Sequence, residues 1–137
     1  MAGKAQAVKS GDELVQQVKG LATSLGLKVR TQFKVGRRIW GAARKIDIVL
    51  VDENTRKMLG VECKFQSVGG TAEEKIPATI QDMAAWPIPG LVVFAGEGFT
   101  RNMDDYLTST GKAVRLDELE PWLRLFFGLP LENNSQD

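Results

Sequence analysis

The chain has 137 residues, of which 43% are hydrophobic and 26% charged, and its formal net charge at pH 7 is +1. Such a composition is ordinary for a soluble globular protein, and the length suits one domain with a single core. Histidine is absent, which excludes serine–histidine and cysteine–histidine catalysis and histidine-ligated zinc. A bound metal ion would therefore need oxygen ligands, which favour Mg²⁺, with Mn²⁺ as a substitute.

Cysteine content and hydropathy suggest the compartment. One cysteine cannot form an internal disulfide, so we expect an intracellular, cytoplasmic protein. Residues 1–6 lack the apolar segment of a secretory signal. No apolar run approaches the roughly 18 residues of a membrane span, so we expect no membrane partner.

Basic residues are concentrated in one part of the chain. Between residues 28 and 45 there are seven basic side chains and no acidic one. Most such stretches are solvated faces, but beside a carboxylate cluster this one fits a protein that holds a polyanion. The seven residues are Lys28, Arg30, Lys34, Arg37, Arg38, Arg44 and Lys45.

The N-terminal third predicts a helix followed by a strand. Ser10 and Glu13 have the spacing of a capping box, and apolar residues then recur at helical spacing as far as Leu25. Residues 27–33 alternate apolar and polar side chains, which predicts a strand with one exposed face. Residues 35–43 contain two glycines and predict a loop or an irregular hairpin connection.

Two apolar runs in the middle of the chain, residues 45–51 and 58–65, predict a pair of antiparallel strands. If Asn54-Thr55 is the tip of the turn, the numbers of opposite residues sum to 109. This register places Asp47 directly across from Glu62.

One face of this hairpin carries the charged residues. Side chains alternate between the faces of a strand, so Glu62, Lys64 and Gln66 point to the side that also receives Asp47. Opposite Cβ atoms are about 4.5–5.5 Å apart, close enough for both carboxylates to hold one divalent ion. Charged groups in strands built for a core are costly unless they are paired or bound to a cation. Two acids and a lysine are also a minimal set for metal-assisted cleavage of a phosphodiester, which predicts a nuclease.

The remaining chain predicts helices alternating with short strands. Helices are expected at about residues 77–85, 100–108 and 117–127, the last capped by Asp117, and an edge strand at 113–116. The continuously apolar run at 91–95 is typical of a strand covered on both faces. Because a helical crossover precedes it, it should pair in parallel with the second central strand.

The domain organisation follows from these elements. We expect a flexible arm at residues 1–9, a single domain at 10–130 and a disordered tail at 131–137. The apolar C-terminal patch completes the core or forms a dimer interface, and it consists of Trp122, Leu125, Phe126 and Phe127.

The order helix, three antiparallel strands, helix, parallel strand resembles the PD-(D/E)XK nuclease superfamily. The resemblance spans about residues 10–96 and rests on Ile46-Asp47 and Glu62-Cys63-Lys64, although the family motif has proline where this chain has Ile46. Residues 70–77 also look like a stretch that follows Glu-x-Lys in some phage and restriction-type members. The resemblance implies an α/β fold (α+β, mixed sheet) with the restriction endonuclease-like αβββαβ core, its central mixed β-sheet flanked by helices.

The resemblance also implies a role for each motif residue. Asp47 and Glu62 would bind Mg²⁺ together with the backbone carbonyl of Cys63, as one ion or two. Lys64 would orient or deprotonate the attacking water and steady the developing negative charge. The predicted catalytic residues are therefore Asp47, Glu62 and Lys64.

Several of these residues have a competing structural interpretation. Asp47 and Lys64 could form a salt bridge across the hairpin. Gln66 supports the lysine or contacts DNA in this scheme, or it is a polar strand end. Several relatives carry a first-helix glutamate that binds metal, and Glu13 could act in that way, yet the capping box with Ser10 alone explains it.

DNA, duplex or branched, is the expected partner. Candidate phosphate contacts are Arg37, Arg38, Arg44 and Lys75. The small size of the domain and the two strands of a duplex favour a homodimer. An endonuclease of a phage or mobile element (then in the host cytoplasm), a resolvase of Holliday junctions or other branched DNA, and a restriction-type enzyme all fit. The alternatives are a catalytically silent nucleic-acid-binding module on the same fold and an interaction domain with structural ion pairs.

Overall fold

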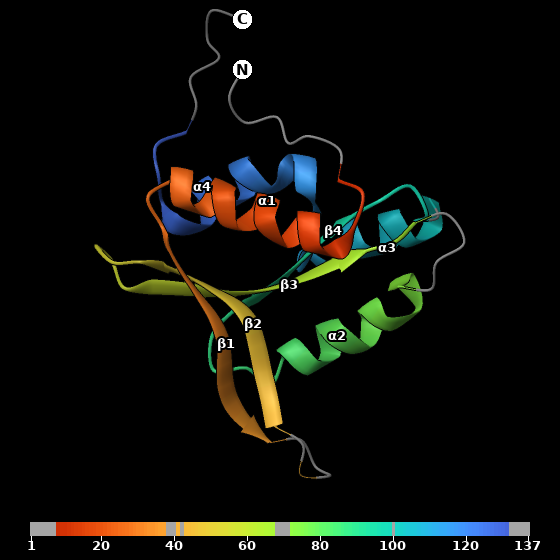
Figure 1. The fold of residues 1–137 in the computed structure, drawn as a ribbon, viewed down its shortest axis with the longest axis horizontal. Helices are drawn as coiled ribbons and strands as arrows, with labels where there is room; N and C mark the ends of the chain where they lie inside the picture. The colour runs from red at the N-terminus through yellow and green to blue at the C-terminus, as the bar shows by residue number, and fades with distance from the viewer. Residues whose placement is uncertain (1–7, 38–40, 42, 68–71, 100, 132–137) are drawn as a thin grey trace, which may run out of the picture.

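The computed structural model describes residues 8–131, apart from 38–40, 42, 68–71 and 100. Five strands form one sheet in the order β1-β2-β3-β4-β5, with helices on both sides (Figure 1). The strands are β1 (Lys28–Arg37), β2 (Ala43–Asp52), β3 (Lys57–Phe65), β4 (Gly90–Ala95) and β5 (Ala113–Arg115). The helices are α1 (Gly11–Ser24), α2 (Ile76–Met83), α3 (Arg101–Thr110) and α4 (Leu119–Phe127), with 3-10 turns η1 (Ala72–Lys75) and η2 (Leu116–Glu118).

The sheet is mixed, as the sequence predicts. β1, β2 and β3 are antiparallel neighbours, whereas β4 pairs in parallel with β3, and β5 in parallel with β4. Parallel neighbours need crossover connections, and α2 and α3 lie in these two crossovers. The predicted parallel pairing of the fourth strand is confirmed. None of the helices in the described ranges is long and apolar enough to cross a membrane.

β2 and β3 pair in the predicted register. The paired residues run from Asp52 opposite Lys57 to Ile48 opposite Val61, so each pair sums to 109. β3 then continues along β4 as far as Phe65. Figure 1 shows β2 turning away from β3 over this last part, together with β1. The two central strands therefore diverge where the motif residues lie.

Helices bury both faces of the sheet in two separate cores (Figure 1). α1 and α4 pack on one face, and α2 and α3 pack on the other. β4 runs between the two layers and is buried on both sides, with Leu91 and Val93 in the first core and Val92 and Phe94 in the second. This confirms the doubly covered strand that its continuous apolar run predicts.

The indole of Trp86 packs on the two glycines at the centre of the second core. Gly60 on β3 pairs with Gly90 on β4. A Cβ atom at Gly60 would lie 2.6 Å from the indole, and one at Gly90 would lie 2.9 Å from it. The absence of side chains at this pair leaves room for the indole to approach the backbone of both strands.

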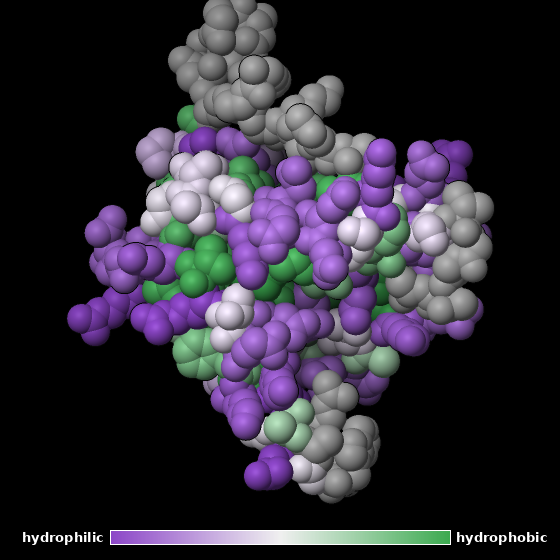
Figure 2. Space-filling model, viewed as in Figure 1, coloured by the Kyte–Doolittle hydropathy of each residue, from purple (hydrophilic) through white to green (hydrophobic). Residues whose placement is uncertain are grey.

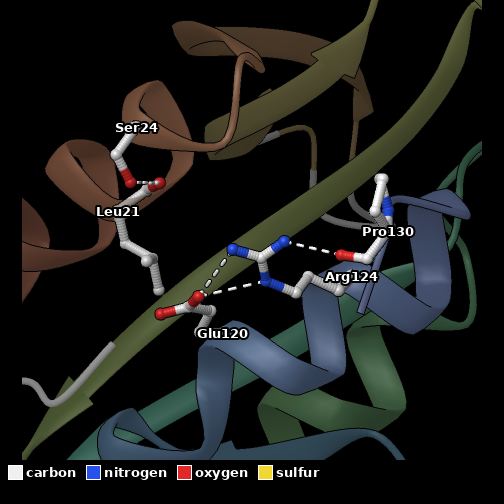
Figure 3. A network of polar contacts seen from close by, with 5 residues as sticks. All are labelled: Leu21, Ser24, Glu120, Arg124 and Pro130. Atoms are coloured by element: carbon white, nitrogen blue, oxygen red, sulfur yellow. Dashed lines mark hydrogen bonds and ion pairs between the residues drawn. The ribbon is translucent and has the colours of Figure 1, made fainter. Parts of the chain in front are cut away.

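An ion pair between Glu120 and Arg124, one turn apart, stabilises the C-terminal helix α4 (Figure 3). Glu120 is only 6% exposed, and its Oε2 accepts hydrogen bonds from Nε and Nη2 of Arg124 at 3.0 and 2.8 Å. The third donor, Nη1 of Arg124, reaches the carbonyl of Pro130 at 2.6 Å. Phe127 is buried in the first core, so α4 completes the core, whereas Leu125 is 70% exposed.

The second half of β1 differs from the prediction. The strand extends to Arg37, through residues expected to form a connection. In the middle of the strand, the side chains of residues 30–34 are all exposed, including Phe33 at 43%, so both faces of the strand are open there rather than one. β1 is an edge strand, and its C-terminal end projects beyond the helices in Figure 1, although Val35 still packs against the second core.

The ends of the predicted helices are confirmed to within about two residues. The start of the last helix is the one difference. Asp117 lies inside η2 instead of capping the helix, and α4 begins at Leu119. The predictions of a flexible arm and a disordered tail fall mostly on residues 1–7 and 132–137, which lie outside the described residues.

Candidate active site

Asp47 and Glu62 lie together where β2 leaves β3. The β2–β3 ladder ends at the pair Ile48–Val61, so the predicted Asp47–Glu62 pair is not part of it. Just beyond the end of the ladder, the backbone N–H of Asp47 donates a hydrogen bond to the Glu62 carboxylate. Asp47 is exposed and Glu62 is half-buried. The cost of burying charge that the sequence suggests therefore applies to Glu62 and not to Asp47.

The surroundings of Glu62 oppose its ionisation. Burial, and next the negative charge of Asp47, raise the pKa of Glu62 from 4.5 to about 6. Its neighbour on β4 is Val92, which is fully buried, so one side of the carboxylate has an apolar wall. Lys64 and the Asp47 N–H act in the opposite direction.

Lys64 lies two residues along β3, on the same face as Glu62. It is half-buried and lies beside Phe94 of β4. Cys63, between the two, points its side chain to the opposite face, against the first core. Burial, followed by the charges of Glu62 and Asp47, raises the pKa of the Cys63 thiol to about 12. The thiol therefore stays protonated and unreactive, which leaves the Cys63 backbone as its only contribution to the site.

A third carboxylate approaches this face from α2. Asp82 contributes to the raised pKa of Glu62, and its Oδ1 accepts a hydrogen bond from Nε of Arg44 at 3.2 Å. Both side chains are about one-fifth to one-quarter exposed. Spacing along the sequence predicts no role for Asp82, because only the packing of α2 against the sheet brings it to the strands.

The donor set fits a hard divalent cation. A cation between Asp47 and Glu62 would offset both the repulsion and the lost hydration that disfavour the ionised glutamate. Mg²⁺ typically binds through one or two carboxylates and keeps waters or phosphate oxygens as its other ligands. Within the described residues, no group of three or more histidine, cysteine, aspartate or glutamate side chains could hold a metal. What these residues offer is thus a carboxylate pair.

A family model of the PD-(D/E)XK nuclease superfamily domain matches residues 6–122. This is most of the chain, and it includes every motif residue. The chain belongs to the PD-(D/E)XK nuclease superfamily. Membership implies nuclease-type chemistry and agrees with the mixed sheet and its flanking helices.

Comparison with other proteins adds no substrate to the PD-(D/E)XK assignment. No curated protein matches the chain. One similar solved structure is titled "Crystal Structure of Protein of Unknown Function AF1548", with 17% sequence identity and a TM-score of 0.49. The match covers 74% of this chain and 57% of that one.

Among the further residues that the PD-(D/E)XK resemblance suggests, Glu13 has a structural role. Its backbone N–H donates to the Ser10 hydroxyl at 3.1 Å, and its own Oε1 accepts from the Lys9 N–H at 2.8 Å. Glu13 is exposed at the start of α1. The cap accounts for this glutamate, and its metal role stays a prediction.

Gln66 is buried and holds a loop. It is 4% exposed, and its Nε2 donates to the Gly98 carbonyl at 2.7 Å. Its backbone carbonyl accepts from the Gly98 N–H at 3.1 Å. A Cβ atom at Gly96 would lie 2.1 Å from that carbonyl oxygen. Gln66 thus joins the end of β3 to the loop after β4, which gives it a structural task in this superfamily member.

The predicted phosphate contacts lie in different settings. Arg44 pairs with Asp82 beside the candidate site. Arg37 is exposed at the end of β1, and its Nη1 donates to the Gly41 carbonyl at 2.9 Å. Lys75 is exposed directly before α2. Arg38 lies outside the described residues.

Proposed function

We propose that this protein is a Mg²⁺-dependent DNA endonuclease that hydrolyses phosphodiester bonds with Asp47, Glu62 and Lys64. The observation that carries the proposal is the convergence of two carboxylates and a lysine on one face of the sheet, at the divergence of β2 and β3. Membership of a nuclease superfamily makes hydrolysis the favoured use of such a set.

Each residue has a task that its position allows. Asp47 and Glu62 would hold the cation, together with the backbone carbonyl of Cys63. A bound Mg²⁺ acidifies water and stabilises negative charge on a phosphoryl oxygen, which makes a nucleophile available without histidine. Lys64 places an ammonium group beside Glu62 on the same face, where it can orient the water and steady charge that develops on the phosphate.

DNA, duplex or branched, is the proposed substrate, and a homodimer is the proposed assembly. The exposed basic side chains of β1 support a polyanionic substrate. Two strands must be cut in a duplex, and a symmetric pair of sites matches their two-fold relation. A phage or mobile-element enzyme and a junction resolvase are both compatible with this activity.

A cleavage assay tests the proposal. Wild type, Asp47→Asn, Glu62→Gln and Lys64→Ala would be incubated with Mg²⁺ or Mn²⁺ on supercoiled, linear, single-stranded and four-way-junction DNA. We expect metal-dependent cutting by wild type and a loss of about 100-fold or more in each variant, because removing one electrostatic contributor typically costs 10²–10³. Glu53→Gln is the matched control, since Glu53 is an exposed acid in the β2–β3 turn.

Two results would contradict the proposal. If wild type cuts none of these substrates with either metal, while binding DNA as the three variants do, the protein is a silent nucleic-acid-binding module. If cutting persists in Glu62→Gln at the level of Glu53→Gln, the activity belongs to another site.

A further inference from the structure

The outer edge of β1 carries an open groove that the proposed catalytic residues do not use. Residues 28–34 line it, and its volume is about 600 Å³. β1 is at the end of the strand order, so no strand of the described ranges pairs with this edge. In the middle of the groove, Gln32 has a left-handed φ of 59° that few residues other than glycine adopt, and it stands between the paired residues Thr31 and Phe33.

The groove combines positive charge with an exposed aromatic ring. Its lining includes Lys28, Arg30 and Lys34 and contains no acid. Phe33, between the last two, is 43% exposed. An exposed apolar ring on an unpaired edge favours aggregation unless a partner covers it. Figure 2 shows a largely hydrophilic surface on the viewed side of the β1–β2 ribbon.

The groove passes beside the candidate active site. Thr31 pairs with Ile48 and Phe33 with Ile46, which places Gln32 next to Asp47 on the neighbouring strand. Adjacent strands are about 4.8 Å apart. A chain lying in the groove would therefore run past Asp47 two strand spacings away, about 10 Å, with β1 between them.

We propose that this groove binds a single strand of DNA, with its phosphates on Lys28, Arg30 and Lys34 and an unpaired base stacked on Phe33. Single-strand sites generally combine a basic track with aromatic platforms, because every base has a face that can stack. The inference rests on the proposed function and narrows its substrate to DNA with an unpaired segment, such as a tail, a flap or an opened junction. A second copy of β1 is a poor occupant, since antiparallel pairing of this edge with itself would bring like charges together.

Binding and cleavage are measured separately. Affinities for fluorescein-labelled 20-mer dT and for a 20-base-pair duplex would be measured by anisotropy with Mg²⁺ present. Every protein in this experiment carries Glu62→Gln to prevent cutting. The groove variants are Arg30→Gln with Lys34→Gln, and Phe33→Leu, which keeps apolar bulk without the ring. Lys112→Gln is the matched control, because Lys112 is exposed before β5 at the opposite end of the sheet.

The proposal predicts a distinct pattern. The double cation variant should bind dT at least about 10-fold more weakly, with a salt slope smaller by about 1.4, since each phosphate contact on a single strand contributes about 0.7. Phe33→Leu should weaken dT binding by about 5-fold or more and change duplex binding by less than about 2-fold, because only an unpaired base can stack. Lys112→Gln should match the parent protein.

Three outcomes would overturn it. In the first, the double cation variant binds dT as tightly as Lys112→Gln does. In the second, Phe33→Leu binds dT as tightly as the parent protein. In the third, sedimentation shows that the groove variants convert a dimer to a monomer, which would make the edge an interface between copies. Cleavage by proteins with intact Glu62 separates the two proposals. Groove-dependent binding without cutting would refute the nuclease alone, and cutting that is unaffected by the groove variants would refute the groove alone.

Discussion

The ionisation of Glu62 is disfavoured by some of its neighbours and favoured by others, and a bound cation would favour it further. Burial and the charge of Asp47 disfavour its ionised form, whereas Lys64 and the N–H of Asp47 favour it, and the pKa stays raised at about 6. At neutral pH the metal-free protein therefore carries a carboxylate in a place that destabilises the fold. Strained electrostatics of this kind are typical of functional sites.

The raised pKa makes a prediction about stability in the absence of metal. The pKa of Glu62 rises from 4.5 to about 6 on folding. Below pH 4.5 the residue is protonated in both the folded and the unfolded chain, so it does not reduce stability. As the pH rises through 6, the folded protein loses stability because its Glu62 ionises less readily than the unfolded chain's. In EDTA at pH 8, Glu62→Gln should be more stable than wild type by about 1 kcal/mol, a value reduced for solvent screening of this half-buried group.

The measurement is urea unfolding at pH 4 and at pH 8 for both proteins. The free energies of unfolding of the two proteins should be nearly equal at pH 4. Glu53→Gln should have the same stability as wild type at both pH values. A Glu62→Gln protein that is less stable than wild type at pH 8 would show that the carboxylate stabilises the fold.

How far the sequence predicts these residues depends on how local their contacts are. Asp47, Glu62 and Lys64 lie on consecutive strands joined by a short turn, so register and alternation suffice to bring them together. Asp82 lies 38 residues from its partner Arg44 in the sequence, and Gly98 lies 32 residues from its partner Gln66. Nothing in their local pattern indicates these contacts.

At the scale of elements, β3 and β4 are held close by the pair Gly60–Gly90 under Trp86. Because a Cβ at Gly60 would lie 2.6 Å from the indole, Gly60→Ala should destabilise the protein by about 1–3 kcal/mol through overpacking. Gly20→Ala is the matched control, since outside its own stretch of helix no atom lies within 4 Å of a Cβ there. In the middle of α1, that change should stabilise by about 0.5–1 kcal/mol. Thermal unfolding of both variants tests this, and a neutral Gly60→Ala would contradict it.

The ion pair between Arg44 and Asp82 ties α2 to the start of β2. The groups are 3.2 Å apart and mostly buried, so removing either alone leaves an unbalanced charge near Glu62. A double-mutant cycle with Arg44→Ala and Asp82→Ala should give a coupling energy of about 1 kcal/mol. A cycle of Arg44→Ala with Asp12→Ala, an exposed acid in the first turn of α1, should give about zero. Equal coupling in the two cycles would mean that the contact contributes nothing.

Element boundaries could be predicted where one pattern dominates. The apolar run of β4 and the helical spacing of α1 predict their elements to within about two residues. The second half of β1 could not be predicted in this way, because glycine and basic residues are typical of loops. Pairing with β2, through Lys34–Lys45 and Arg37–Ala43, makes it a strand in spite of its composition.

At the scale of the molecule, the site follows from the way the sheet opens. β3 stays with β4 between the two helical layers, while β2 leaves with β1 (Figure 1). The divergence exposes Asp47 but keeps Glu62 and Lys64 half-buried. A long basic edge strand then flanks the opening. Superfamily membership could be predicted from the spacing of the motif residues. Substrate and assembly depend on surface residues from several elements, which leave no clear pattern along the sequence.

A divalent cation held by Asp47 and Glu62 can be detected by titration calorimetry with Mn²⁺. Wild type should bind Mn²⁺ and, at ten times its Kd, gain about 1.4 kcal/mol of stability. Asp47→Asn and Glu62→Gln should each lose this binding, and Glu53→Gln should keep it. Mn²⁺ binding that survives in both site variants, or that is absent from wild type, would mean that Asp47 and Glu62 do not hold a cation.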